Sequence, residues 1–116
     1  MKKPVVWITQ EPMRKDISGR WVSKGLDLAS ASEYGNTIII WGPDASIMSR
    51  DLVETEAIDA ANAYNDQQDY IVALGSPTLS AVLSWAIGKA GKTLRMLEWD
   101  NKMAHYHPTL RDSFRK

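Results

Sequence analysis

The fold of this chain is decided by one segment, Asp69-Tyr-Ile-Val-Ala-Leu-Gly-Ser-Pro-Thr-Leu-Ser80, which has the pattern of a strand, a tight turn and the start of a helix. Residues 70–74 are apolar without alternation, as is typical of a central strand that is covered on both faces. Gly75 permits the turn, the hydroxyl of Ser76 can cap the helix, and Pro77 suits the first helical position. Such a joint is where α/β proteins usually hold a ligand.

The joint is also the candidate ligand site. Free N–H groups at a helix start favour an anion, so Gly75, Ser76, Pro77 and Thr78 are the expected binding residues for a small phosphorylated ligand. Asp27 would join them as a polar partner if its loop folds back to the carboxyl ends of the strands, although an ordinary turn is the alternative. The joint lacks both the glycine spacing of a dinucleotide site and the lysine of a P-loop. It therefore predicts a place and not a reaction.

Further strands are expected on either side of this segment. They fall at residues 5–9, 37–41, 93–99 and 103–107. The last two form an antiparallel hairpin, because Asp100-Asn-Lys102 is a turn signal and Pro108 ends the second strand. Trp99 and Tyr106 can pair across its two strands. Residues 13–36 show no regular pattern except for a short strand around Trp21 and Val22.

Two helices separate the central strands. The first is expected at residues 51–64, where Asp51 and Glu54 are spaced like a capping box. The second, at residues 77–90, is apolar on nearly all sides and is therefore expected to be mostly buried.

The alternation of strands and helices predicts β-α-β crossovers. The predicted fold class is α/β, a small Rossmann-like three-layer domain with a mainly parallel sheet and a C-terminal antiparallel hairpin. Residues 70–74 would be central and the hairpin 93–107 would lie at an edge.

Length and composition narrow the function classes. A chain of 116 residues is expected to form a single domain over residues 1–116. It has no cysteine, which excludes disulfides, thiol nucleophiles and cysteine zinc sites and suits the cytoplasm. Its 14 basic and 14 acidic residues cancel, which disfavours nucleic acid and anionic membranes as partners. No signal peptide or membrane span is apparent, so a cytoplasmic location is expected.

Other chemistry is weakly supported. His105 and His107 have the spacing of two metal ligands on a strand, but no third ligand is evident, so no metal site and no cofactor are predicted. Ser76 or Thr78 could be a nucleophile only beside a base. The sequence leaves open whether the chain has catalytic activity.

Three landmarks resemble a known group of proteins. They are Asp27-Leu-Ala-Ser-Ala-Ser-Glu-Tyr-Gly35, Asp69-Tyr-Ile-Val-Ala-Leu-Gly-Ser-Pro77, and Leu94-Arg-Met-Leu-Glu-Trp-Asp100 followed by Tyr106 and Pro108. In order and spacing they are similar to D-L-S-x-A-x-x-F-G, D-Y-x-x-x-x-G-D-P, and L-x-x-L-x-W-D before Y-x-P in short phage and prophage proteins. Ser30 occurs one place late, and Ser76 replaces an aspartate. The resemblance implies a phage-encoded protein in the host cytoplasm and no particular activity.

Two hypotheses remain. The first is a non-enzymatic accessory binding protein that docks onto a host protein or forms a homodimer. A dimer would cover apolar residues of helix 77–90 and of the hairpin, with Trp99 and Tyr106 in the interface. The second is a nucleotide- or phosphate-binding protein or enzyme that uses the Gly75-Ser76-Pro77 joint.

Overall fold

A five-stranded sheet forms the centre of the computed structural model, which describes residues 3–11, 13–23, 30–45, 49–100 and 102–109. The strands are β1 (Val5–Gln10), β4 (Asn36–Trp41), β5 (Tyr70–Val72), β6 (Met96–Asp100) and β7 (His105–Thr109). Their order is β4-β1-β5-β6-β7, and every pair is parallel except β6 with β7. The mainly parallel sheet, its central strand and its C-terminal hairpin are therefore confirmed. The central strand ends at Val72, two residues earlier than expected.

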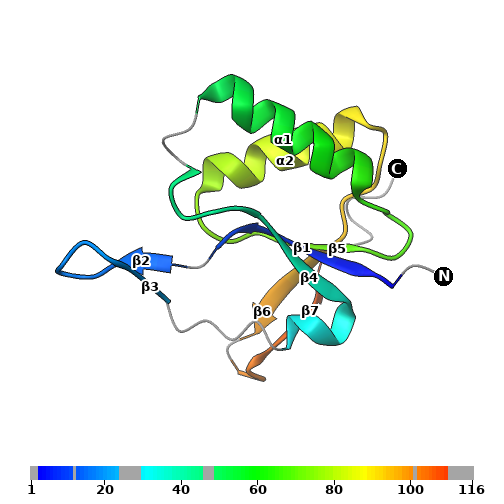
Figure 1. Cartoon of the computed structure of the whole chain (residues 1–116). Helices are drawn as coiled ribbons and strands as arrows, with labels where there is room; N and C mark the ends of the chain where they lie inside the picture. Colours follow the sequence, from blue (N-terminus) through cyan, green and yellow to red (C-terminus); the bar gives the residue numbers. More distant parts are fainter. Residues whose placement is uncertain (1–2, 12, 24–29, 46–48, 101, 110–116) are drawn as a thin grey trace.

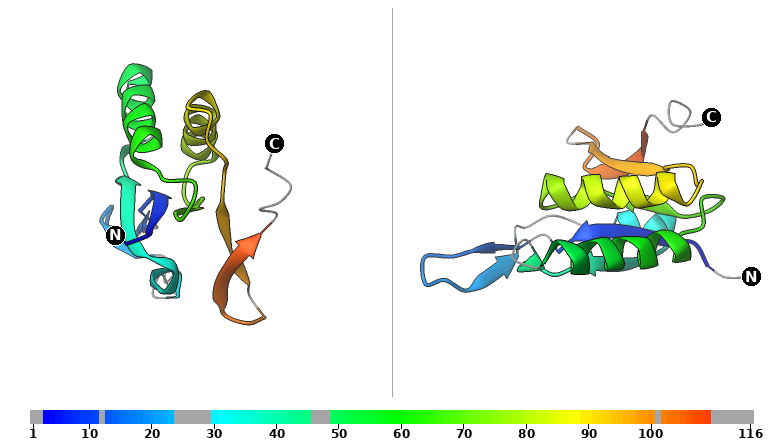
Figure 2. Two further views of the ribbon diagram at one scale, coloured as in Figure 1. Left: turned by 90° about the vertical axis from the view of Figure 1, so that its right-hand side faces the viewer. Right: turned by 90° about the horizontal axis from the view of Figure 1, so that it is seen from above.

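Both α-helices pack on one face of the sheet, and they are α1 (Arg50–Ala63) and α2 (Pro77–Lys89) (Figures 1 and 2). The connections β4-α1-β5 and β5-α2-β6 cross the sheet in the same direction. Crossovers of one hand then place both helices on one side. The 3-10 helix η1 (Ala31–Tyr34) lies on the opposite face, so the third layer is thin.

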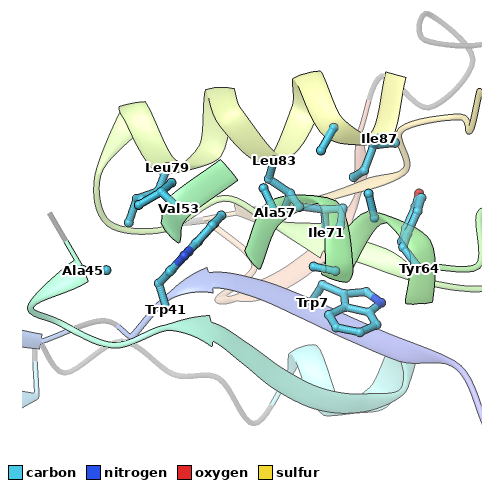
Figure 3. Close-up of a cluster of buried hydrophobic side chains, with 13 residues drawn as sticks. Trp7, Trp41, Ala45, Val53, Ala57, Tyr64, Ile71, Leu79, Leu83 and Ile87 are labelled. Carbon is cyan, nitrogen blue, oxygen red and sulfur yellow. The ribbon is translucent and has the colours of Figure 1, made fainter. Parts of the chain in front are cut away.

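The sheet has a hydrophobic cluster on each face because side chains alternate along a strand. Trp7, Trp41 and Ile71 project towards the two helices, as Figure 3 shows. Val6, Ile8 and Val72 belong to the opposite cluster, together with Ala31 of η1. The strands β1 and β5 are apolar without alternation because both of their faces are covered.

A second, two-stranded sheet projects from the body of the protein (Figure 1). It pairs β2 (Met13–Lys15) with β3 (Trp21–Ser23). The strand around Trp21 is thus confirmed, but its partner was missed because Met13-Arg-Lys15 is too short to show a β pattern. The side chain of Asp16 holds the turn by accepting from the N–H of Arg20 (3.0 Å).

The capping of the two helices differs from the sequence prediction. The residue that caps α1 is Ser49, whose Oγ accepts from the N–H of Leu52 (3.3 Å), and the capping box at Asp51 and Glu54 is wrong. At α2, Ser76 has the expected position, but its hydroxyl makes no capping hydrogen bond.

Two further expectations need correction. Helix α2 is not mostly buried: Leu79, Leu83, Ala86 and Ile87 face the core, whereas Trp85 is 47% exposed. The sheet and α1 cover only one side of α2, which leaves the other side in solvent. Pro108 does not end the last strand but lies within β7, where an edge position tolerates proline. No helix in the described part of the chain is both long and apolar enough to span a bilayer.

Candidate functional site

The strand order places a topological switch point between β1 and β5. The chain leaves β1 towards β4 on one side, whereas β5 lies on the other side of β1. In open α/β sheets, ligands bind in the crevice outside the carboxyl ends of such a strand pair. Here this crevice lies between Gln10, at the end of β1, and Gly75, which follows β5. The predicted joint is therefore at the expected place in the fold.

The side chain of Gln10 fills the crevice. Its Oε1 accepts from the N–H of Ser76 (2.7 Å), and its Nε2 donates to the carbonyl oxygens of Gly42 (3.1 Å) and Pro43 (3.4 Å). It is 7% exposed. Gln10 thus connects the ends of all three neighbouring strands, a role that the sequence did not reveal because its partners are distant along the chain.

Gly75 is required by this arrangement for two reasons. Its φ is +80°, which glycine adopts at little cost. A Cβ at this position would lie 2.6 Å from Cβ of Gln10 and 2.8 Å from its Cδ. The glycine therefore permits the close approach of Gln10 as well as the turn.

Thr9 closes the crevice from the β1 side. Its hydroxyl donates to the carbonyl of Leu74 (2.6 Å) and accepts from the N–H of the same residue (2.8 Å). The hydroxyl of Ser80 lies 3.4 Å away. Protein groups therefore bond the side chains of both Thr9 and Gln10 at the switch point.

The other predicted anion-binding residues lie at the start of α2. Pro77 has no N–H, and the N–H of Ser76 is bonded to Gln10. The helical ladder begins with the N–H of Ser80, which donates to Ser76 O (3.3 Å). The N–H groups of Thr78 and Leu79 thus precede the ladder. Asp27 lies outside the described residues.

A groove of about 770 Å³ opens beside this joint, between α1 and α2. Both helices follow strands of the parallel sheet, so their N-termini lie at the same end of the molecule (Figure 2). The lining includes Val53, Leu79 and Val82, with Trp85 exposed and Thr78 shared with the predicted site. The groove is therefore apolar, with polar atoms near the helix starts.

Helix α1, which forms one wall of the groove, carries a net negative charge. The guanidinium of Arg50 pairs with the carboxylate of Glu54 (3.0 Å), and both residues line the groove. Asp51, Glu56 and Asp59 are three more carboxylates on α1 outside the groove lining, and Arg50 is the only cation of this helix. On α2, the ammonium of Lys89 lies 5.1 Å from the ring centre of Trp85.

The hairpin residues Trp99 and Tyr106 form the predicted cross-strand pair. Their rings meet edge to face with centres 5.2 Å apart. Asp100 begins the turn by accepting from the N–H groups of Met103 (3.2 Å) and Lys102 (2.9 Å), and these bonds lower the pKa of its carboxyl. Tyr106 is buried within the single chain, so its role in a dimer interface stays a prediction.

Asp69 is a buried carboxylate with a structural role. Its Oδ1 accepts from the N–H of Val5 (2.9 Å), and its Oδ2 accepts from Trp7 Nε1 (3.0 Å) and from the N–H of Asn65 (2.9 Å). These bonds join the start of β1 to the connection between α1 and β5. Among the described residues, no three His, Asp or Glu side chains gather as metal ligands.

Comparison with known families agrees with the landmarks in the sequence. The model of the Phage Pam3 gp32-like protein family matches residues 4–112, and the chain belongs to this family. The resemblance to phage proteins is confirmed. No curated protein and no solved structure matches the chain.

Proposed function

We propose that this phage-family protein is a non-enzymatic binding module, whose α1–α2 groove accepts an apolar, basic segment of another protein. The single observation that carries the proposal is the groove itself, an apolar surface with an exposed tryptophan at the edge of two packed helices. A host protein is the partner that a phage accessory protein would engage.

The position of Trp85 supports a protein partner. Tryptophan is enriched among the residues that contribute most to protein interfaces. Leu79, Leu83, Ala86 and Ile87 satisfy the packing of α2 without it. Exposure of so large an apolar side chain is therefore not required by the fold, and a bound segment would remove it from water.

The charges on α1 support a basic partner. Four carboxylates against one guanidinium give this helix a net negative charge, and the three carboxylates outside the groove lining, Asp51, Glu56 and Asp59, place that charge beside the groove. Lysine or arginine in the partner segment would be attracted, whereas an acidic segment would be repelled. A basic amphipathic helix that presents apolar residues to the groove fits both features.

An anion site is the second candidate, because the N–H groups of Thr78 and Leu79 precede the helical ladder and Arg50 lines the same groove. It ranks second for two reasons. The N–H of Ser76 already bonds Gln10, and Glu54 already pairs with Arg50.

A displayed library of random peptides tests the first candidate. Immobilised protein should enrich peptides that combine apolar residues with lysine or arginine. Truncating a tryptophan at the centre of an interface costs about 2 kcal/mol or more of binding free energy. Trp85→Ala should therefore lower the affinity for these peptides by about thirtyfold. Met103→Ala is the matched control, since Met103 is 64% exposed and lies outside the groove; it should leave their affinity unchanged.

Other outcomes would reject the proposal. Failure to enrich any peptide, or equal affinity for the parent and Trp85→Ala, removes the groove as the binding surface. Enrichment of acidic peptides contradicts the charge argument. Calorimetric titration with inorganic phosphate and nucleotides tests the second candidate, and binding heat that Arg50→Ala abolishes would favour it.

A further inference from the structure

The outer edge of β4 is an unprotected sheet edge. β4 ends the sheet on one side and β7 ends it on the other (Figure 2). The sequence of β4, Asn36-Thr-Ile-Ile-Ile-Trp41, contains no charged residue and no proline. Edge strands usually carry such residues because a bare edge pairs with other strands. β7, by contrast, contains Pro108 between polar neighbours.

Some backbone N–H and C=O groups of β4 point away from β1, towards the open side of the sheet. The N–H of Asn36 donates to Pro4 O (2.9 Å), which places the backbone groups of Asn36 towards β1. Because these groups alternate along a strand, those of Thr37 and Ile39 point away from β1. Among the described residues, no group pairs with the backbone of Thr37 or Ile39 on this open side.

Two exposed isoleucines extend the two hydrophobic clusters to this edge. Ile38 lies opposite Trp7 on the helix side of the sheet, and Ile39 lies opposite Ile8 on the other side. Their exposures are 41% and 42%. One added strand would cover both side chains as well as the open backbone groups.

We propose that the occupant is a second copy of this chain, whose β4 pairs antiparallel with β4 about a two-fold axis at Ile38. Identical strands are complementary to themselves in this arrangement. Thr37 and Ile39 of one protomer would face Ile39 and Thr37 of its partner, which matches the residues whose backbone groups point outwards. Ile38 would meet its own counterpart in a non-hydrogen-bonded pair, where Cα atoms are about 4.5 Å apart.

This interface is separate from the proposed groove. The groove lies between α1 and α2, and the edge presents backbone groups of β4. It also replaces the hairpin as the expected dimer contact, because Tyr106 is buried and β7 contains proline. Failure of either proposal leaves the other standing.

Single cysteines test the register, because the parent chain has none. A Cα separation of about 4.5 Å suits a disulfide, so Ile38→Cys should form a covalent dimer as the main product on mild oxidation. Ile39→Cys is the register control: its counterpart would be diagonal, about 7–8 Å away, and should crosslink far less. His107→Cys reports a contact through β7 and should stay monomeric.

Light scattering on the full-length parent chain provides the second measurement. The parent chain should have the mass of two chains, and Ile39→Lys should have the mass of one. The Ile39→Lys variant should still show a thermal unfolding transition, because the substitution lies at the surface of the single chain. Should that variant fail to fold, the cysteine results decide alone. A parent mass of one chain at high micromolar concentration, or efficient crosslinking of His107→Cys instead of Ile38→Cys, would overturn the proposal.

Discussion

Replacing Asp69 with alanine should remove a large part of the stability of this fold. Asp69 is 2% exposed, and its carboxylate accepts three hydrogen bonds, from Val5 N, Trp7 Nε1 and Asn65 N. Leaving a buried donor without an acceptor costs about 1–3 kcal/mol. The indole of Trp7 would bear the full cost, whereas water can partly replace the acceptor at the two part-buried amides.

Asp69→Ala is therefore expected to lower the free energy of unfolding by about 4 kcal/mol. An ordinary domain has a free energy of unfolding of about 5–15 kcal/mol in total. Asp69→Asn should lose about 2 kcal/mol, because its amide keeps one acceptor and turns an NH₂ group towards a donor. Asp59→Asn is the matched control. Asp59 is exposed on α1, and the change should stay within about 0.5 kcal/mol.

Urea denaturation followed by tryptophan fluorescence measures these differences, since two of the five tryptophans, Trp7 and Trp41, lie in the core. The midpoint should fall in the order Asp59→Asn, Asp69→Asn, Asp69→Ala. A loss below about 1 kcal/mol for Asp69→Ala would refute the reasoning, because one unsatisfied buried indole alone should exceed it. A loss of similar size in the Asp59 control would show a general charge effect instead.

The structure also predicts how changes at four other positions affect stability. Gly75→Ala should lower the free energy of unfolding by more than about 2 kcal/mol, because φ at this position is positive and Gln10 is close. Gly88→Ala, at an exposed helical site with open space, should raise the free energy of unfolding by about 0.5–1 kcal/mol. Equal shifts of the melting temperature in the two variants would contradict this. Burial raises the pKa of Tyr64 to about 12. Because the folded pKa exceeds the unfolded value of about 10, the free energy of unfolding should fall between pH 10 and 12. In a titration at 295 nm, the parent chain should show a late-titrating component that Tyr64→Phe lacks. Lys92 donates to three carbonyl groups at the C-terminal end of α1. Lys92→Met should therefore lower the free energy of unfolding by about 1 kcal/mol in urea denaturation. An unchanged urea midpoint would argue against a stabilising role of Lys92 at this helix end.

Local patterns in the sequence were sufficient for much of the fold. The segment from Asp69 to Ser80 predicted the central strand, the turn at Gly75 and the start of α2, and all three are confirmed. The turn at Asp100 and the Trp99–Tyr106 pair were predicted in the same way. Each depends on residues close in the chain or on a two-residue period, which report burial and turns without knowledge of the partners.

Contacts between distant segments were not predictable. Gln10 is the clearest example: its partners at Gly42 and Ser76 are 32 and 66 residues away, and glutamine at the end of a strand has no distinctive pattern. The exposure of Trp85 depends on which side of α2 the sheet and α1 leave open. The groove, too, exists only because two crossovers of the same direction place both helices on one face.

Two apolar strands show the limit of what the sequence predicts. Residues 37–41 and 70–74 are both uncharged and mainly apolar, and both were predicted as strands. Only the strand order makes one of them an edge with open backbone groups and the other the centre of the sheet. Apolar periodicity measures how much of a strand is buried by the layers above and below it, whereas its neighbours within the sheet are chosen by long-range pairing, which the tertiary structure alone decides.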